Sequence, residues 1–149
     1  MLAGPMHDSS REPPLGAARA PAPHSIAREV VAVASGGMIG ASLRFAVAIA
    51  AESAGLHSAI GTGIANVTGS FLLGALLARF DAPSAHPLYR PFWVIGVFGS
   101  YTTFSTLALD NRLLAGGHGE LLALVHLIGS MSLGLAAFAL GYRMRGGRR

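Results

Sequence analysis

The sequence contains no cysteine and no lysine, and only 12% of its 149 residues are charged. Without cysteine the chain has no disulfide framework, no thiolate nucleophile and no thiolate metal site. A soluble domain carries about twice this charged fraction, whereas 52% of the residues here are hydrophobic. The composition therefore excludes a disulfide-stapled fold and predicts a small membrane protein with several spans.

Acidic residues are scarce within the hydrophobic segments. Glu29, Glu52, Asp110 and Glu120 all lie near the expected segment ends. A proton-coupled exporter of cationic compounds needs a carboxylate within the membrane to exchange protons for substrate. The chain also lacks an HExxH sequence and a phosphate-cradling loop, and its hydroxyls have no obvious base beside them. These absences argue against such an exporter and against an enzyme.

Four hydrophobic spans are expected, at residues 28–51, 57–78, 91–109 and 120–142. Each has about the 20 residues that cross a bilayer as a helix. Residues 1–25 are rich in Pro, Ala, Ser and Arg and predict a disordered tail, followed by a membrane domain at 26–143 and a basic tail at 144–149. Short connections at 81–87 and 111–119 predict an all-α four-helix bundle with both termini on one side.

The arginines indicate how the bundle is oriented. Apart from Arg44, every arginine except Arg112 falls on the side of the two termini. The positive-inside rule then places both termini in the cytoplasm, and we expect a multi-pass protein of the plasma membrane. Because the arginines stand at segment ends, snorkelling and orientation explain them, and no nucleic-acid partner is expected.

Small residues recur at four-residue spacing within the spans. Gly36 and Gly40 form a GxxxG pair, and the same spacing continues elsewhere, at Gly61, Ala65 and Gly69 and at Ser130 and Gly134. This spacing allows helix backbones to approach closely in lipid. By itself it indicates packing rather than a function.

Three polar side chains lie inside the spans. Arg44 is either a residue that snorkels toward a helix end or a cation that lines a wet vestibule. Asn66 either makes an interhelical hydrogen bond or offers an amide N–H to a passing anion. His126 is predicted to be neutral and hydrogen-bonded.

The third span carries an unusual run of hydroxyl residues from Thr102 to Thr106, just after Gly99. Ser and Thr side chains bond to the local backbone and compete with the helix, so a break in this helix is expected. A break frees carbonyl groups, and carbonyl oxygens suit Na⁺ or a similar hard cation. Phe104 is an apolar filler by default, but its ring also has a positive edge against which a small anion can rest.

Three segments of the chain resemble signature segments of the small fluoride channels of the CrcB (Fluc) family. GGMIGASLRF at Gly36–Phe45 is similar to the family's first-helix signature, and GTGIANVTGSFLLG at Gly61–Gly74 to its second-helix signature with a central Asn. GVFGSYTTFST at Gly96–Thr106 is similar to its third-helix break. The resemblance covers essentially Val30 to Gly141.

The resemblance implies passive fluoride efflux through an antiparallel, dual-topology dimer with two pores. It implies that Asn66 and Phe104 line the pore, that Arg44 lies at the vestibule, and that hydroxyl groups form a polar track, namely those of Thr103, Ser105, Thr106 and Ser130. It also implies a structural Na⁺ at the dimer centre, held by the backbone carbonyls of Gly99 and Thr102.

The chain departs from the family pattern at two positions. The family usually has a second aromatic residue three positions after the first, where this chain has Leu107, and a Tyr where it has His126. The arginine asymmetry also disfavours insertion in both orientations. These features suggest a heterodimer with an oppositely oriented paralogue as an alternative to a homodimer. A small proton-coupled multidrug-type transporter and a non-transporting membrane assembly protein are the alternative functions.

Overall fold

The computed structural model describes residues 23–80 and 85–146, so most of the predicted N-terminal tail and residues 147–149 lie outside the described part. Within that part, regular structure is helical throughout. The elements are α1 (Pro23–Ser53), α2 (Ser58–Phe80), the π-helical η2 (Arg90–Phe98), α3 (Gly99–Tyr101), α4 (Phe104–His118) and α5 (Glu120–Gly146). The tail boundaries at 25 and 144 remain predictions.

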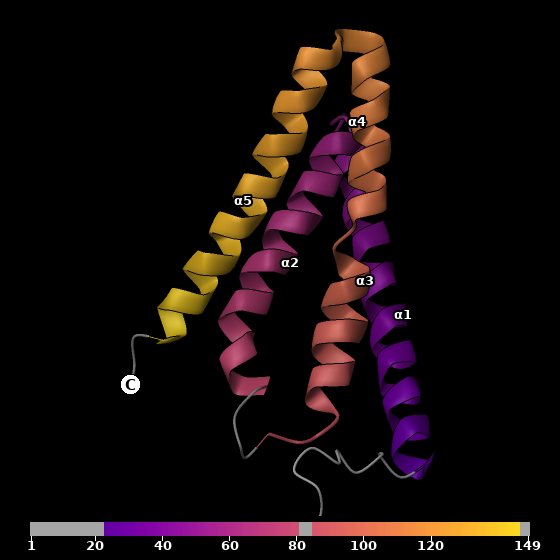
Figure 1. Cartoon of the computed structure of the whole chain (residues 1–149). Coiled ribbons are helices and arrows are strands. Elements are labelled where there is room, and N and C mark those ends of the chain that lie inside the picture. The colour runs from indigo at the N-terminus through magenta and orange to yellow at the C-terminus, as the bar shows by residue number, and fades with distance from the viewer. Residues whose placement is uncertain (1–22, 81–84, 147–149) are drawn as a thin grey trace, which may run out of the picture.

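Four stretches are long and apolar enough to cross a membrane, which confirms the predicted number of spans. They are Ile26–Ser53, Ser58–Leu77, Arg90–Gly117 and Glu120–Met144. In Figure 1 the start of α1 and the end of α5 lie at the same end of the bundle, opposite the turn that joins α4 to α5. The connectivity therefore agrees with an even number of crossings.

The end of the third span was predicted too early. Residues 111–119 were expected to form a connection, but α4 continues to His118 and Gly119 alone separates it from α5. Gly119 has a positive φ of 96°, which glycine adopts without the strain that a Cβ causes. As a consequence Asp110 lies about two turns inside the third span, and the expectation that it stands near the span's end is wrong.

The buried positions of the bundle are occupied mainly by small residues. Ala32, Ala51, Ala59, Ala65 and Ala123 are all at most 8% exposed. Large apolar side chains point outward instead, as at Leu121, Leu135 and Phe45, each at least 67% exposed. This inside-out arrangement suits a solvent of lipid tails, in which helices associate through close packing of small residues.

Glycines mark the closest helix crossings. A Cβ built on Gly40 would overlap the Val97 carbonyl of η2, and one built on Gly36 would overlap the Phe92 carbonyl. The GxxxG pair of α1 is therefore a true contact surface. The α2–α5 crossing uses Gly74 and Gly141 in the same way, each against a backbone carbonyl of the other helix.

Replacing Gly74 by Ala should destabilise the protein by about 1–3 kcal/mol, because the added methyl overpacks the α2–α5 crossing. The matched control is Gly63→Ala in the same helix, where a Cβ meets nothing within 4 Å. Since Ala is the better helix former, this control should be neutral or stabilising. Thermal unfolding in detergent measures both, and equal effects would contradict the packing argument.

Candidate ion pathway at the Thr102–Thr103 segment

Two extended residues interrupt the helical backbone between α3 and α4. Thr102 has φ −81° and ψ 152°, and Thr103 has φ −148° and ψ 124°. The hydroxyls of both threonines bond to nearby backbone groups, as the sequence predicted. Thr102 Oγ1 donates to the Phe98 carbonyl at 2.8 Å, and Thr103 Oγ1 accepts the Thr106 N–H at 3.2 Å as the N-cap of α4.

Asn66 of α2 binds this segment with both ends of its side-chain amide. Its Nδ2 donates to the Thr103 carbonyl at 2.9 Å, and its Oδ1 accepts the Thr103 N–H at 2.7 Å. The expected interhelical bond of Asn66 is thus made to backbone rather than to a side chain. An amide NH₂ carries two hydrogens, so a second N–H remains for another acceptor.

These bonds change the pairing of two carbonyls, that of Gly99 at the start of α3 and that of Thr102 just after it. In a continuous helix the Thr103 N–H would bond to the Gly99 carbonyl, and the Thr106 N–H to the Thr102 carbonyl. Here the first N–H goes to Asn66 and the second to the Thr103 hydroxyl. The two carbonyls predicted to bind a cation therefore lose their helical N–H partners, one to Asn66 and the other to the Thr103 hydroxyl.

Arg44 approaches the same segment from α1. Its Nε donates to the Ser100 carbonyl at 3.1 Å. The side chain also lines a cavity of about 150 Å³ together with Thr62, Thr103 and Thr106. Its guanidinium is therefore directed into the bundle, which favours the vestibule interpretation over snorkelling.

Four of the predicted site residues meet around a second cavity of about 380 Å³. Asn66, Thr103, Phe104 and Ser130 all line it, and so does Leu107. Thr103 lines both cavities and so lies between Arg44 and the Phe104 ring. Phe104 is 66% exposed in the single chain, so its ring faces the surface of the protomer.

A short chain of hydroxyls connects most of the predicted polar track. Thr103 Oγ1 lies 3.2 Å from Ser105 Oγ and donates to Thr106 Oγ1 at 3.1 Å. Ser130 comes from α5 and joins them only as a wall of the larger cavity. The predicted track is thus hydrogen-bonded at the start of α4, whereas Ser130 on α5 is not bonded to the other three hydroxyls.

Sequence analysis missed a polar stripe between α2 and α4. Ser58, Thr62 and Asn66 recur at four-residue spacing, and Thr62 lines the smaller cavity with Thr106. At the end of the stripe Asp110, only 3% exposed, accepts the Ser58 hydroxyl at 3.0 Å. Asp110 Oδ2 is buried without a hydrogen-bond partner in the described part of the chain. The spacing was the signal that could have revealed this stripe.

His126 differs from its prediction. Its buried Nδ1 has no hydrogen-bond partner among the described residues. The cavity that it lines is mainly apolar, and the hydroxyl of Thr68 in the same wall bonds to the Ile64 carbonyl of its own helix. The expected hydrogen bond at this nitrogen is therefore wrong.

Four apolar spans around an amide- and hydroxyl-lined segment define a small multi-pass membrane protein with a polar interior at mid-span. A family model described as CrcB-like protein, Camphor Resistance (CrcB), matches residues 31–142. The chain belongs to this family, which confirms the family predicted from the three signature segments.

Three named relatives align with this chain over most of their own length. A fluoride-specific ion channel FluC of Aeromonas salmonicida is 38% identical over 115 residues, covering 75% of this chain and 91% of the relative. One from Idiomarina loihiensis is 40% identical over 107 residues, covering 70% and 82%. A FluC 2 channel of Nocardia farcinica is 36% identical over 113 residues, covering 75% and 81%.

Asn66→Ala should lower the free energy of unfolding by about 2–4 kcal/mol, because it leaves the Thr103 N–H and carbonyl without partners. A suitable control is Ser35→Ala, since the Ser35 hydroxyl bonds only to carbonyls of its own helix. Its effect should stay within about 0.5 kcal/mol. Chemical or thermal unfolding in detergent compares them, and a neutral Asn66→Ala would refute a stabilising role for these bonds.

Proposed function

We propose that this chain is a fluoride channel that lets the anion leave the cell passively. The observation that carries the proposal is the meeting of Asn66, Thr103, Phe104 and Ser130 around one cavity in a member of this family. The membrane is proposed to be the plasma membrane, with fluoride as the conducted ion. The proposed activity is conduction, with no covalent step.

The chemistry of the cavity suits a small anion that must lose its water. The second amide N–H of Asn66 and the hydroxyl of Ser130 are donors that can replace water, while the Thr103 hydroxyl already donates to Thr106 Oγ1. The positive edge of the Phe104 ring adds a weaker contact. Arg44, beside the smaller cavity, supplies a permanent positive charge that concentrates anions at the entrance.

The membrane potential is sufficient to drive the flux. Fluoride enters from acidic surroundings as the neutral acid and is trapped inside as the anion. At about 100 mV, inside negative, one charge gains about 2.3 kcal/mol on leaving. This corresponds to about a 40-fold lower internal concentration at equilibrium. The proposed export requires neither ATP nor a coupled proton.

The extended Thr102–Thr103 segment is proposed to break the third membrane span and to hold a structural Na⁺. The Gly99 and Thr102 carbonyls fit this role, because their helical N–H partners are engaged by Asn66 and by the Thr103 hydroxyl. Carbonyl oxygens are suitable ligands for this ion. When bound, Na⁺ would neutralise these dipoles and fix the segment.

The proposed assembly is an antiparallel dimer with Na⁺ at its centre. Support comes from Phe104, whose ring is two-thirds exposed in one protomer and needs a second wall to enclose an ion. A homodimer and a heterodimer with an oppositely oriented paralogue both provide that wall. The arginine asymmetry and Leu107 favour the heterodimer.

A proton-coupled transporter is the second candidate, and Asp110 is the observation that favours it. A buried carboxylate inside the third span is the feature such transporters use. Against it, one oxygen of Asp110 is already bonded to Ser58, at the first residue of α2. The positive end of the α2 dipole stabilises a carboxylate there without proton exchange. A non-transporting assembly protein leaves the cavity residues unexplained.

Protein-loaded liposomes with internal potassium fluoride should release fluoride to an electrode when a K⁺ ionophore is added. Phe104→Ile should slow release by about two- to twelvefold, the value of an aromatic contact of about 0.5–1.5 kcal/mol. Asn66→Asp should slow it further, because it places like charge beside the anion. Phe80→Leu is the matched control, since that ring stacks on Trp93 away from the cavity.

Two results would contradict the proposal. Wild-type protein that releases no fluoride after ionophore addition would exclude a channel. Release that follows an imposed pH gradient, and that Asp110→Asn abolishes, would favour the transporter instead. Wild-type flux in Phe104→Ile and Asn66→Asp would remove these two residues from the path.

Na⁺ should raise the thermal midpoint relative to N-methylglucamine, by an amount equivalent to about 2.7 kcal/mol at a hundredfold excess over Kd. Thr103→Val should reduce this difference, because the freed Thr106 N–H can then compete for the Thr102 carbonyl while the Asn66 bonds to the Thr103 backbone persist. Thr103→Ser keeps the hydroxyl and should retain the full Na⁺-dependent difference in thermal midpoint. The same Na⁺ effect in both variants would refute the proposed carbonyl site.

A further inference from the structure

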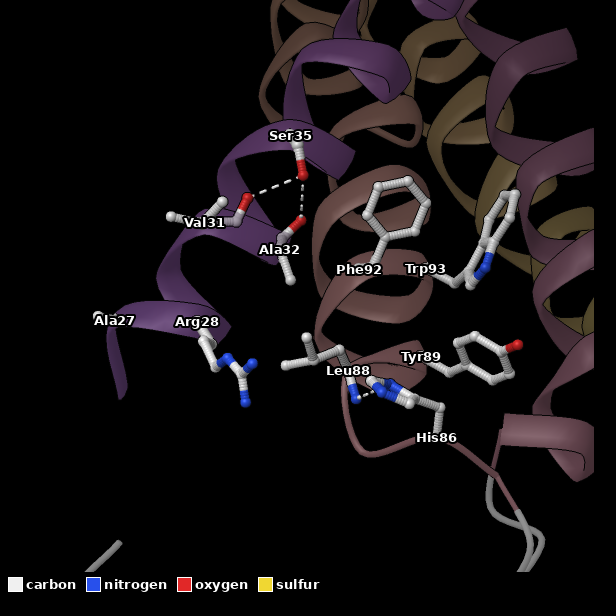
Figure 2. Close-up of a pocket in the computed structure, with 10 residues that line it drawn as sticks. All are labelled: Ala27, Arg28, Val31, Ala32, Ser35, His86, Leu88, Tyr89, Phe92 and Trp93. Carbon is white, nitrogen blue, oxygen red and sulfur yellow. Dashed lines mark hydrogen bonds between the residues drawn. The ribbon is translucent and has the colours of Figure 1, made fainter. Parts of the chain in front are cut away.

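A large groove lies far from the Thr102–Thr103 segment, between the start of α1 and the start of η2. Its volume is about 600 Å³. Figure 2 shows Arg28 and His86 at its outer end, with Phe92 and Trp93 further into the bundle. The outer end lies at the end of the bundle where α1 starts and where α2 and α5 end (Figure 1). The groove thus runs inward from one face of the membrane.

The groove is apolar along its length and polar only at its outer end. Val31, Leu88, Phe92 and Trp93 form the walls. Ser35 also lines it, but its hydroxyl donates to the Val31 and Ala32 carbonyls at 2.8 and 3.1 Å and offers little to a ligand. An apolar slot with a polar mouth matches a molecule with a hydrocarbon chain and a polar head.

The mouth of the groove carries positive charge. Arg28 is exposed and makes no ion pair or hydrogen bond with the described part of the chain, and none of the described residues that line the groove is acidic. Arg79 and Arg90 stand at the same end of the bundle. Basic pockets between helices on the cytoplasmic side bind anionic headgroups. The charge therefore complements an anionic rather than a zwitterionic lipid.

An aromatic cluster fixes one side of the groove at headgroup depth. Trp93 stacks on Phe80 with ring centroids 6.3 Å apart, and Tyr89 meets Phe80 edge-on at 6.5 Å. His86 packs against Tyr89 at 5.8 Å, and its Nδ1 accepts the Leu88 N–H. Trp and Tyr gather where the bilayer meets water. These ring contacts hold one wall of the groove together, and its aromatic residues are of the kind that favour the depth of lipid headgroups.

We propose that this groove binds one anionic phospholipid, with the headgroup phosphate at Arg28 and an acyl chain along Val31, Phe92 and Trp93. A soluble anion would use the mouth and leave the apolar walls unfilled. A zwitterionic lipid would fill the walls without the gain from net charge at the rim. The site is independent of the proposed fluoride path, since it shares no lining residue with either cavity there.

The only tryptophan in the chain makes the site directly measurable. Trp93 lines the groove, and bromine atoms on a lipid acyl chain quench tryptophan fluorescence at close range. Full-length protein in neutral detergent micelles is titrated with acyl-brominated phosphatidylglycerol or with the matching brominated phosphatidylcholine. Phosphatidylglycerol should quench at a lower concentration than phosphatidylcholine.

Two matched pairs of variants locate the lipid. Arg28→Gln should weaken phosphatidylglycerol binding about fivefold, equivalent to about 1 kcal/mol per arginine near the surface. Arg143→Gln removes charge from the last turns of α5, outside the groove, and should change the affinity less than twofold. Val31→Phe fills the groove and should abolish the preference for phosphatidylglycerol over phosphatidylcholine. Val30→Phe changes a neighbouring exposed position outside the groove and should preserve that preference.

Several outcomes would overturn the proposal. Equal quenching by the two lipids would show that charge does not select the occupant. Equal affinity in Arg28→Gln and Arg143→Gln, or in Val31→Phe and Val30→Phe, would place the lipid elsewhere. Absence of quenching by either lipid would mean that protein fills the groove, either residues 1–22 or a second copy.

Discussion

The paired hydrogen bonds between the Asn66 amide and the Thr103 backbone are the contact on which the central part of this molecule depends. A backbone N–H and carbonyl within lipid must find partners inside the protein. Asn66 provides both partners at once, 2.9 and 2.7 Å away. Because it does so, the chain can leave the helix at Thr102 and Thr103 without leaving polar groups unpaired. The carbonyls, hydroxyls and ring of the proposed ion path are all positioned by that departure.

The surrounding helices serve to bring α2 and the third span close enough for this contact. Gly69 illustrates how tight the approach is, because a Cβ there would lie 2.6 Å from the Thr102 methyl. Glycines at the α1–η2 and α2–α5 crossings fix the positions of the other helices. Packing of small residues and interhelical polar bonds replace the hydrophobic effect as the source of association in lipid. Large apolar side chains remain on the outside, where lipid tails can cover them.

Hydropathy predicted the four spans, and the hydroxyl run identified the segment where the backbone becomes extended. The sequence could not reveal that Asn66 binds backbone, because a tertiary contact across 37 positions leaves no local pattern. The third span ends later than predicted because packing of α4 on α5 overrides the turn-like composition of Gly116, Gly117 and Asn111. Because the third span was predicted to end at residue 109, Asp110 was not recognised as a residue inside it. The π-helical turn of η2 has no recognisable signal beyond Pro91 at its start.

The central claim is that Asn66 holds Thr102 and Thr103 extended, and so keeps the Gly99 and Thr102 carbonyls out of helical bonds. Solid-state NMR of the membrane-embedded protein can test it, because Cα chemical shifts distinguish extended from helical residues. In the wild type both threonines should have extended shifts. In Asn66→Leu, which cannot form either bond, we predict helical shifts at Thr102 and Thr103. Extended shifts that persist in the folded variant would contradict the account.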